Sequence, residues 1–278
     1  MISLPVYRNL KFAIGFLISI LVFVTMINPE LLFAQPQVEV APATAESESA
    51  FKQERPKKTT KILLIGNSFT FWRGGLDRHL KTLSRAMSLT PDYQTKAVTR
   101  GGASLEVMWR KTSAVAEIKK GNYDIVILQE DLPETTVESF RIYSKKFVDL
   151  VRQVGARPIL FMTWDYKRLD WISMDEIANA HLELSRKLKV EVAPAGVGWA
   201  ISKKQRPDLD MYEKDAEHPS AAGMFLSLLL IESTISGKSP LTRSSKKLKI
   251  KGLEKLSPKD IKDLQTVAED ALKIWKQK

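Results

Sequence analysis

Two hydrophobic patterns alternate along the chain from residue 61 onward. Short apolar runs rich in β-branched residues predict strands at Ile62–Ile65, Tyr93–Thr99, Tyr123–Leu128, Pro158–Thr163 and Val190–Pro194. Stretches in which apolar residues recur at helical spacing predict helices at Gly75–Met87, Ser104–Lys120, Val137–Val154, Met174–Leu188, Ala221–Ser236 and Ser257–Trp275. Strands that alternate with helices are typical of an α/β fold with right-handed crossovers.

The strand predicted at Tyr123–Leu128 indicates the type of sheet. It is apolar on both faces, as in parallel sheets that helices cover on both sides. We therefore expect a three-layer α/β/α sandwich with a mostly parallel central sheet.

The amino-terminal residues follow a different pattern. Arg8 and Lys11 precede an apolar stretch, Phe12–Ile27, and Ala34 offers a small residue for cleavage. This order predicts an export signal over residues 1–34. The alternative is an uncleaved membrane anchor, for which the stretch is slightly short. In either case we expect the body of the protein outside the cytoplasm, in the periplasm or the extracellular space.

Composition divides the remainder into three parts. Residues 35–60 are rich in Pro, Ala, Glu and Ser and have no apolar period, which predicts a disordered linker. Residues 61–238 carry the alternating pattern and form the predicted domain. Residues 239–278 are basic and predict a C-terminal helical extension, whose helix has an N-cap serine and a first-turn proline at Ser257-Pro258.

Charge and cysteine content narrow the classes of function. The chain has 278 residues, of which 44% are hydrophobic, enough for a globular core. It has no cysteine, which excludes disulfides, a thiol nucleophile and thiolate metal sites. The net charge is +11, but the lysines are scattered and no nucleic-acid-binding motif accompanies them. We expect no nucleic-acid partner, and the sequence does not indicate an oligomeric state.

The turn after the first predicted strand carries a candidate nucleophile. Gly66-Asn67-Ser68-Phe69-Thr70 follows Ile62–Ile65 directly, which places the Ser68 hydroxyl at the carboxyl end of a buried strand, where open α/β sheets bind their ligands. Free N–H groups of the next helix would stabilise negative charge there. Alternatively, Ser68 only caps that helix, a role for which Asn67 and Thr70 compete.

A candidate base and its partner lie just before the last apolar helix. Asp215 precedes His218 by three residues, and Pro219 disfavours helix at His218. The carboxylate can accept a hydrogen bond from the imidazole Nδ1, so that Nε2 takes the proton of Ser68. The alternative is a plain turn in which Ser220 caps the helix.

Together these residues resemble the motifs of the SGNH (GDSL-type) hydrolase superfamily, in particular a branch with Gly-Asn-Ser-Phe-Thr at the nucleophile. The resemblance spans residues 61–237. It implies the flavodoxin-like fold of that superfamily and a catalytic triad of Ser68, Asp215 and His218 that hydrolyses esters.

The resemblance also implies the groups that would stabilise an oxyanion. Two are the backbone N–H groups of Ser68 and Gly102. The superfamily normally adds an asparagine side chain from Gly-x-Asn-Asp, but here the strand ends in Gln129-Glu130-Asp131. We expect the Gln129 amide to donate in its place. Alternatively, Gln129 is a polar strand end that bonds a neighbouring loop.

Two aromatic residues near these motifs are candidates for substrate binding. Trp164 follows the strand Pro158–Thr163 and, by the resemblance, would line an acyl or sugar pocket; alternatively it covers the core. Trp72, just past the nucleophile, is the second candidate.

Acidic residues also follow the strand that ends at Gln129. Glu130, Asp131 and Glu134 have no histidine at metal-ligand spacing, so we interpret them as a solvated loop. We expect no metal and no cofactor.

These patterns predict an exported serine esterase that cleaves carboxylic esters through an acyl-enzyme. Its candidate substrates are short-acyl esters and acetylated carbohydrates. The rival hypothesis is a non-catalytic envelope protein that keeps the fold and binds anionic glycan through its basic surface. We expect membrane contact only through the amino-terminal segment, if it is not cleaved.

Overall fold

The computed structural model of the chain describes residues 59–86, 92–242, 250 and 252–278. The predicted export signal and all but the last two residues of the predicted linker lie outside the described residues. No helix within these ranges is long and apolar enough to span a membrane.

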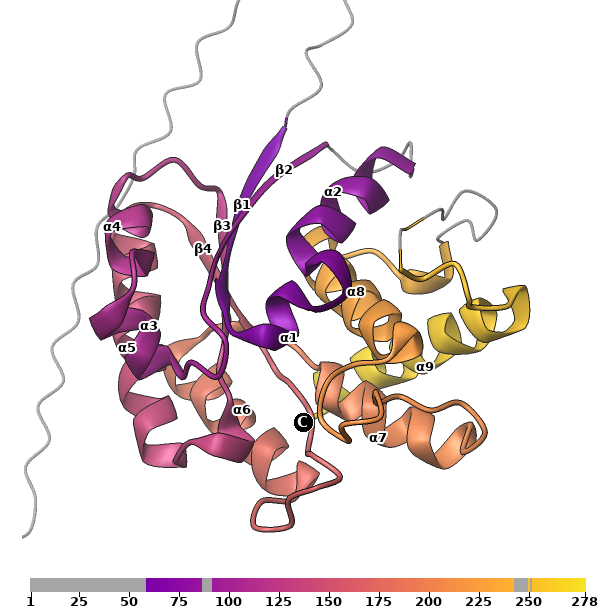
Figure 1. Cartoon of the computed structure of the whole chain (residues 1–278). Helices are drawn as coiled ribbons and strands as arrows, with labels where there is room; N and C mark the ends of the chain where they lie inside the picture. Colours follow the sequence, from indigo (N-terminus) through magenta and orange to yellow (C-terminus); the bar gives the residue numbers. More distant parts are fainter. Residues whose placement is uncertain (1–58, 87–91, 243–249, 251) are drawn as a thin grey trace, which may run out of the picture. The chain divides into compact units, whose positions relative to one another are not determined.

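Five parallel strands form one central sheet (Figure 1). They are β1 (Thr60–Gly66), β2 (Tyr93–Thr99), β3 (Ile125–Gln129), β4 (Arg157–Phe161) and β5 (Glu191–Ala193). The strand order is β2-β1-β3-β4-β5, which is the order of flavodoxin-like folds. The predicted α/β/α sandwich is therefore confirmed.

Helices cover both faces of this sheet (Figure 1). One face packs against α2 (Leu76–Ala86), α7 (Ala195–Gln205), α8 (Ala221–Ser236) and α9 (Pro258–Lys276). The other packs against α3 (Leu105–Lys111), α4 (Ala114–Lys119), α5 (Val137–Gln153) and α6 (Met174–Leu188). Shorter helical segments are α1 (Ser68–Phe71), η1 (Trp72–Gly74), η2 (Leu132–Glu134) and η3 (Pro240–Thr242).

The alternation of side chains along each strand builds two hydrophobic cores. In β1, Ile62 and Leu64 point into the core under α8, whereas Leu63 and Ile65 point into the core under α5. Because both faces are buried over Ile62–Ile65, each of these four positions is apolar. Helix α8 is apolar all round because the sheet, α2, α7 and α9 surround it.

The strand order reverses at one point of the sheet, between β1 and β3. From β1 the chain crosses to β2 on one side and then to β3 on the other. Loops that leave the carboxyl ends of β1 and β3 therefore diverge, and this is where such sheets bind ligands. The turn of Ser68 follows β1 and Gln129 ends β3, so the topology brings both to this part of the sheet edge.

The helix predicted at Ser104–Lys120 is two helices, α3 and α4. The break occurs at Thr112 and Ser113. The Thr112 hydroxyl donates to the Met108 carbonyl (2.6 Å) and accepts from the Ala114 N–H (3.1 Å). Side chains of this kind compete with helical hydrogen bonds for the backbone.

Helix α7 was not predicted, because Gly196 and Gly198 disrupt its helical pattern. Close packing requires both glycines. A Cβ on Gly196 would lie 2.2 Å from the Thr163 carbonyl oxygen, and one on Gly198 would lie 2.8 Å from the Leu230 side chain.

The predicted C-terminal extension packs on the domain. Leu264, Val267, Ala268 and Ala271 of α9 are buried in the same core as α8. Its amino end has the predicted Ser257 cap, which accepts from the Asp260 N–H.

Candidate active site

The predicted nucleophile lies where β1 becomes α1. Asn67 caps α1: its side-chain oxygen accepts from the Phe69 N–H (3.1 Å). Asn67, and not Ser68, therefore caps α1, which excludes the alternative in which Ser68 only caps this helix. As a result, the Ser68 hydroxyl is available to a side chain from elsewhere in the chain.

That side chain is His218, which lies 150 residues away in sequence. Its Nε2 is 2.8 Å from the Ser68 Oγ, and its Nδ1 is 2.8 Å from an Asp215 carboxylate oxygen. The structure thus joins Ser68, His218 and Asp215 in one continuous chain of hydrogen bonds. This is the order in which a carboxylate orients an imidazole that activates a hydroxyl.

Asp215 is also held by the backbone of its own turn. One carboxylate oxygen accepts from the N–H groups of Glu217 (3.0 Å) and His218 (2.9 Å). Partial burial disfavours the charged form, but hydrogen bonds from His218 and Glu217 outweigh it and lower the pKa of Asp215. The carboxylate is therefore ionised at neutral pH, as a partner for an imidazolium must be.

The loop that carries His218 is fixed on both sides. Ala216 has a φ of 61°, which costs a residue with a Cβ about 1 kcal/mol. Its N–H donates to the Glu213 carbonyl (3.0 Å), and its carbonyl accepts from the Lys167 N–H (2.9 Å). These bonds hold the turn between Asp215 and His218 in a strained conformation, as is common at functional sites.

The ring of His218 is packed between aromatic side chains. Trp72 stacks on it, with ring centres 3.8 Å apart and an angle of 17° between the planes. Phe69 contacts it at 5.5 Å. Trp72, predicted to bind substrate, thus fixes the plane of the imidazole, and its contact with substrate stays a prediction.

Arg73 joins the nucleophile turn to the histidine loop. Its guanidinium donates to the Pro219 carbonyl (3.2 Å) and to the Glu213 carboxylate, and it also reaches the Gly252 carbonyl (3.1 Å). Arg73 has a left-handed backbone, with a φ of 49°. These contacts tie together two segments that must meet for Ser68 to reach His218.

The structure does not support the predicted role of Gln129 as an oxyanion donor. Gln129 is 1% exposed, and its Oε1 accepts from the Asn67 N–H (2.8 Å) and the Thr70 hydroxyl (3.0 Å). Its Nε2 donates to the Glu130 carbonyl (2.9 Å). The Gln129 side chain therefore holds the nucleophile turn in place through hydrogen bonds. This is similar to the alternative in which Gln129 bonds a neighbouring loop.

Gly66 makes room for this arrangement. A Cβ at Gly66 would lie 2.4 Å from both the Gln129 Oε1 and the Thr70 Oγ1. Any larger residue would displace the amide that holds the turn.

Two of the three acidic residues after β3, Glu130 and Asp131, are buried, so the interpretation of these two as part of a solvated loop was wrong, whereas Glu134 is exposed. Glu130 and Asp131 are 2% and 3% exposed. One Glu130 oxygen accepts from the N–H groups of Leu105 (3.1 Å) and Asp131 (2.8 Å), whereas the other has no hydrogen-bond partner among the residues that the structure describes. Burial raises the pKa of Glu130 to about 7 and that of Asp131 to about 6.

Asp131 supports the nucleophile turn directly. Its carboxylate accepts from the Asn67 side-chain amide (2.8 Å) and the Tyr166 hydroxyl (2.6 Å). Sequence reasoning missed this role. The available signal was a carboxylate placed immediately after a fully buried strand, where solvent is excluded.

Trp164 does not line a pocket, contrary to the prediction. It is 0% exposed, stacks on Trp199 with ring centres 3.6 Å apart, and donates from its indole to the Glu217 carbonyl (3.0 Å). It covers the core, as in the alternative, and positions the loop next to His218.

Gly102 lies on the loop that follows β2, beside the nucleophile turn. Thr99 is paired with Gly66 across the sheet, and the Arg100 N–H donates to the Gly66 carbonyl (3.2 Å). Gly102 has a φ of 60° and is exposed. Its predicted contact with an oxyanion stays a prediction.

Glu217 is a further polar group at the site that sequence reasoning missed. Its carboxylate lies 4.0 Å from the His218 Nε2, the atom that faces Ser68. Arg168 holds it with a bond of 2.7 Å and also pairs with Glu134. A carboxylate thus lies beside the imidazole nitrogen that faces Ser68.

Within the described ranges, no group of three or more His, Asp or Glu side chains is arranged to hold a metal ion.

Comparisons with known proteins find structural neighbours. No family model matches the chain, and no curated protein matches it. A Slackia heliotrinireducens protein assigned to the SGNH hydrolases is 25% identical over 64% of this chain and 100% of its own, with a TM-score of 0.52.

Two further solved structures share the fold. A DUF4886 family protein from Bacteroides uniformis is 15% identical over 80% of this chain and 97% of its own, with a TM-score of 0.61. A variant of Axe2, an acetyl-xylooligosaccharide esterase from Geobacillus stearmophilus, is 14% identical over 64% of this chain and 94% of its own, with a TM-score of 0.51.

Proposed function

We propose that this chain, which has the fold of the SGNH hydrolases, is a serine esterase that hydrolyses carboxylic esters. The observation that carries the proposal is the continuous chain of hydrogen bonds from the Ser68 hydroxyl through His218 to Asp215, with both bonds at 2.8 Å. A non-catalytic binding protein would not need this geometry or a loop held in a strained conformation.

The proposed reaction proceeds in two halves. His218 Nε2 takes the proton of Ser68 as Oγ attacks the ester carbonyl, and Asp215 stabilises the imidazolium. The tetrahedral intermediate collapses, His218 protonates the leaving alcohol, and an acyl-serine remains. Water then attacks the acyl carbon and gives its proton to His218. The carboxylic acid leaves as Ser68 recovers its hydroxyl.

The oxyanion would be held by backbone N–H groups at the same edge of the sheet. The Asn67 N–H already donates to the Gln129 side chain, and the N–H groups of Phe69 and Thr70 are bonded within the turn. The proposal assigns the oxyanion to the N–H groups of Ser68 and Gly102, and one such donor is worth about 10²–10³ in rate.

Short acyl groups, including acetyl groups on carbohydrates, are the substrates that we propose. The neighbour Axe2 is an acetyl-xylooligosaccharide esterase, and its fold is shared. We also propose that the protein is exported and acts in the periplasm or outside the cell, with its amino-terminal segment as signal or anchor, because residues 1–34 have the order of an export signal.

Ser68→Ala tests the proposed function. The wild-type protein should hydrolyse a short-chain aryl ester and be labelled by a fluorophosphonate, and Ser68→Ala should lose the label and at least about 10³-fold in kcat/KM. Ser113→Ala is the matched control, because Ser113 is exposed and its side chain forms no cap bond. Equal turnover by Ser68→Ala and wild type would refute the assignment.

A further inference from the structure

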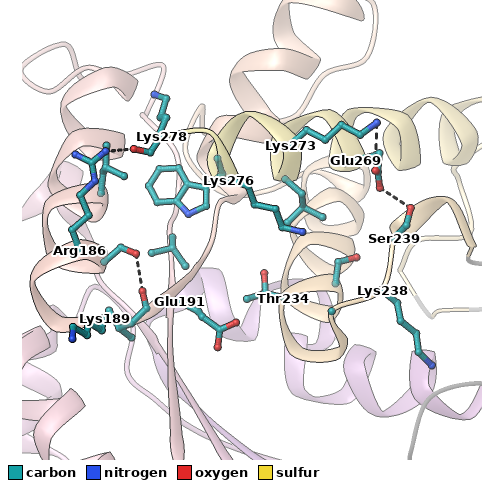
Figure 2. A pocket seen from close by; sticks show the side chains of 18 residues that line it. Arg186, Lys189, Glu191, Thr234, Lys238, Ser239, Glu269, Lys273, Lys276 and Lys278 are labelled. Atoms are coloured by element: carbon teal, nitrogen blue, oxygen red, sulfur yellow. Dashed lines mark hydrogen bonds and ion pairs between the residues drawn. The ribbon is translucent and has the colours of Figure 1, made fainter. Parts of the chain in front are cut away.

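A cavity of about 660 Å³ lies away from the triad, between β5 and the carboxyl-terminal ends of α6, α8 and α9 (Figure 2). We call it the basic groove. Its cationic lining residues are Arg186, Lys189, Lys238, Lys273, Lys276 and Lys278.

The acidic residues of the basic groove are already paired. Arg157 binds both carboxylate oxygens of Glu191, at 2.5 and 2.7 Å. Glu269 accepts from the Ser239 hydroxyl (2.6 Å) and pairs with Lys273 (3.4 Å). Within the described residues, no carboxylate forms an ion pair with Lys189 or Lys276, so the groove has a surplus of positive charge.

Capping of helix ends does not account for these lysines. Cations are favourable at helix carboxyl ends, but Arg157 already donates to the last carbonyls of α8, those of Thr234 (2.9 Å) and Ile235 (3.0 Å). At the end of α6, the Ser185 carbonyl accepts from the backbone N–H groups of Lys189 and Val190. The ammonium groups of Lys189 and Lys276 therefore remain available to a ligand.

A buried hydroxyl in the groove also lacks a partner. Ser233 lines the groove and is 4% exposed, yet its Oγ forms no hydrogen bond within the described residues. An unsatisfied buried hydroxyl costs about 1–3 kcal/mol, and a ligand that bonds it would recover that cost. The unpartnered Ser233 hydroxyl is evidence for a ligand that does not depend on the surplus of positive charge in the groove.

The remaining lining suits the flat face of a sugar. Trp275 is half-buried and supplies the aromatic part of the lining, whereas Val190 and Val192 are buried, at 3% and 4% exposed. The Thr234 hydroxyl donates to the Leu230 carbonyl (2.8 Å), so it can offer a ligand only an acceptor. Aromatic and aliphatic surface with a few placed polar groups is the usual composition of a small-ligand site.

We propose that the basic groove binds a segment of an anionic polysaccharide whose sugar units carry carboxylates. The lysines Lys189 and Lys276 pair with the carboxylates, Ser233 bonds a sugar hydroxyl, and Trp275 packs against a sugar face. This site is separate from the triad, and it does not depend on the proposed esterase activity.

Binding of oligogalacturonate to the Ser68→Ala protein tests the proposal, because no catalysis is required. Calorimetric titration should show saturable binding, and a neutral xylo-oligosaccharide should not bind. Lys189→Glu/Lys276→Glu should weaken the affinity about tenfold, equivalent to about 1.4 kcal/mol, whereas circular dichroism and the melting temperature should stay close to those of the parent.

A control with the same change in net charge distinguishes binding in the basic groove from attraction to the overall positive charge of the protein. Lys81 and Lys119 are exposed on α2 and α4, outside the groove, so Lys81→Glu/Lys119→Glu should change the affinity less than about twofold. An equal loss in both double variants, undiminished binding by the groove variant, or binding of the neutral sugar would each overturn the proposal. Binding of anionic vesicles but not of oligogalacturonate would overturn it in favour of a lipid surface.

Discussion

The side chain of Asn67 caps α1 and donates to Asp131, and these two bonds determine what its neighbour does. A serine at a strand end can cap the following helix, and the sequence does not exclude that role for Ser68. Because Asn67 takes it, the Ser68 hydroxyl meets His218 instead. The sequence predicted which residues would meet, but not which residues support them, because Gln129, Asp131 and Trp164 act through contacts that only the folded chain creates.

Trp72→Ala should show whether the indole positions the base or binds substrate. Its stacking on His218 fixes the imidazole plane, so we expect kcat to fall about tenfold with a smaller change in KM. Trp72→Phe should recover most of kcat. Steady-state kinetics with an aryl acetate provide the measurement, and a raised KM with unchanged kcat would instead indicate substrate contact.

Glu217 should select against negatively charged esters. Its carboxylate is 4.0 Å from the His218 Nε2, and a partly exposed charge pair at such range is worth up to about 1 kcal/mol. Glu217→Gln should therefore raise kcat/KM for an ester with an anionic acyl group about fivefold relative to its neutral analogue. Asp149→Asn, at an exposed position on α5, should leave that ratio unchanged.

At the scale of the elements, the hydrophobic pattern predicted the strands and most of the helices, because burial on one face or two dictates residue choice. Met174–Leu188 and Ala221–Ser236 match α6 and α8 to the residue. The pattern missed α7 because its glycines are required by close packing against residues far away in the sequence, although glycine disfavours helix. It merged α3 and α4 because a threonine side chain, not a change in hydrophobicity, ends the first helix.

Gly196→Ala should destabilise the protein even though alanine favours helix. The new methyl would lie 2.2 Å from the Thr163 carbonyl oxygen, a backbone atom that cannot move freely. We expect a loss of about 1–3 kcal/mol in the free energy of unfolding by urea titration. Gly101→Ala has open space around its Cβ and should change that free energy by less than about 0.5 kcal/mol.

For the molecule as a whole, buried titratable groups link stability to pH. Burial raises the pKa of Glu130 to about 7 from 4.5, so the folded state keeps a proton that the unfolded state releases between about pH 4.5 and 7. Stability from this group is present below that window and is lost as the pH rises through it. His181, whose pKa burial lowers to about 4, has the opposite effect, because the unfolded state binds the proton first.

Glu130→Gln measures how much the Glu130 carboxyl group contributes to the pH dependence of the free energy of unfolding. The effect of His181 is common to both proteins and cancels in the difference. Relative to wild type, the variant should gain on the order of 2 kcal/mol between pH 5 and pH 8, measured as the difference in free energy of unfolding at each pH. A pH-independent difference would show that Glu130 has the same pKa in the folded and unfolded chain.

Helix α8 connects two distant parts of the molecule. Its first residues follow the histidine loop, and its last residues line the basic groove. Its 16 residues measure about 24 Å at 1.5 Å per residue, so a small ester cannot touch both ends, whereas a long acylated polymer can. Added salt should therefore slow the deacylation of a long acidic glycan and leave the turnover of an uncharged monomeric ester unchanged.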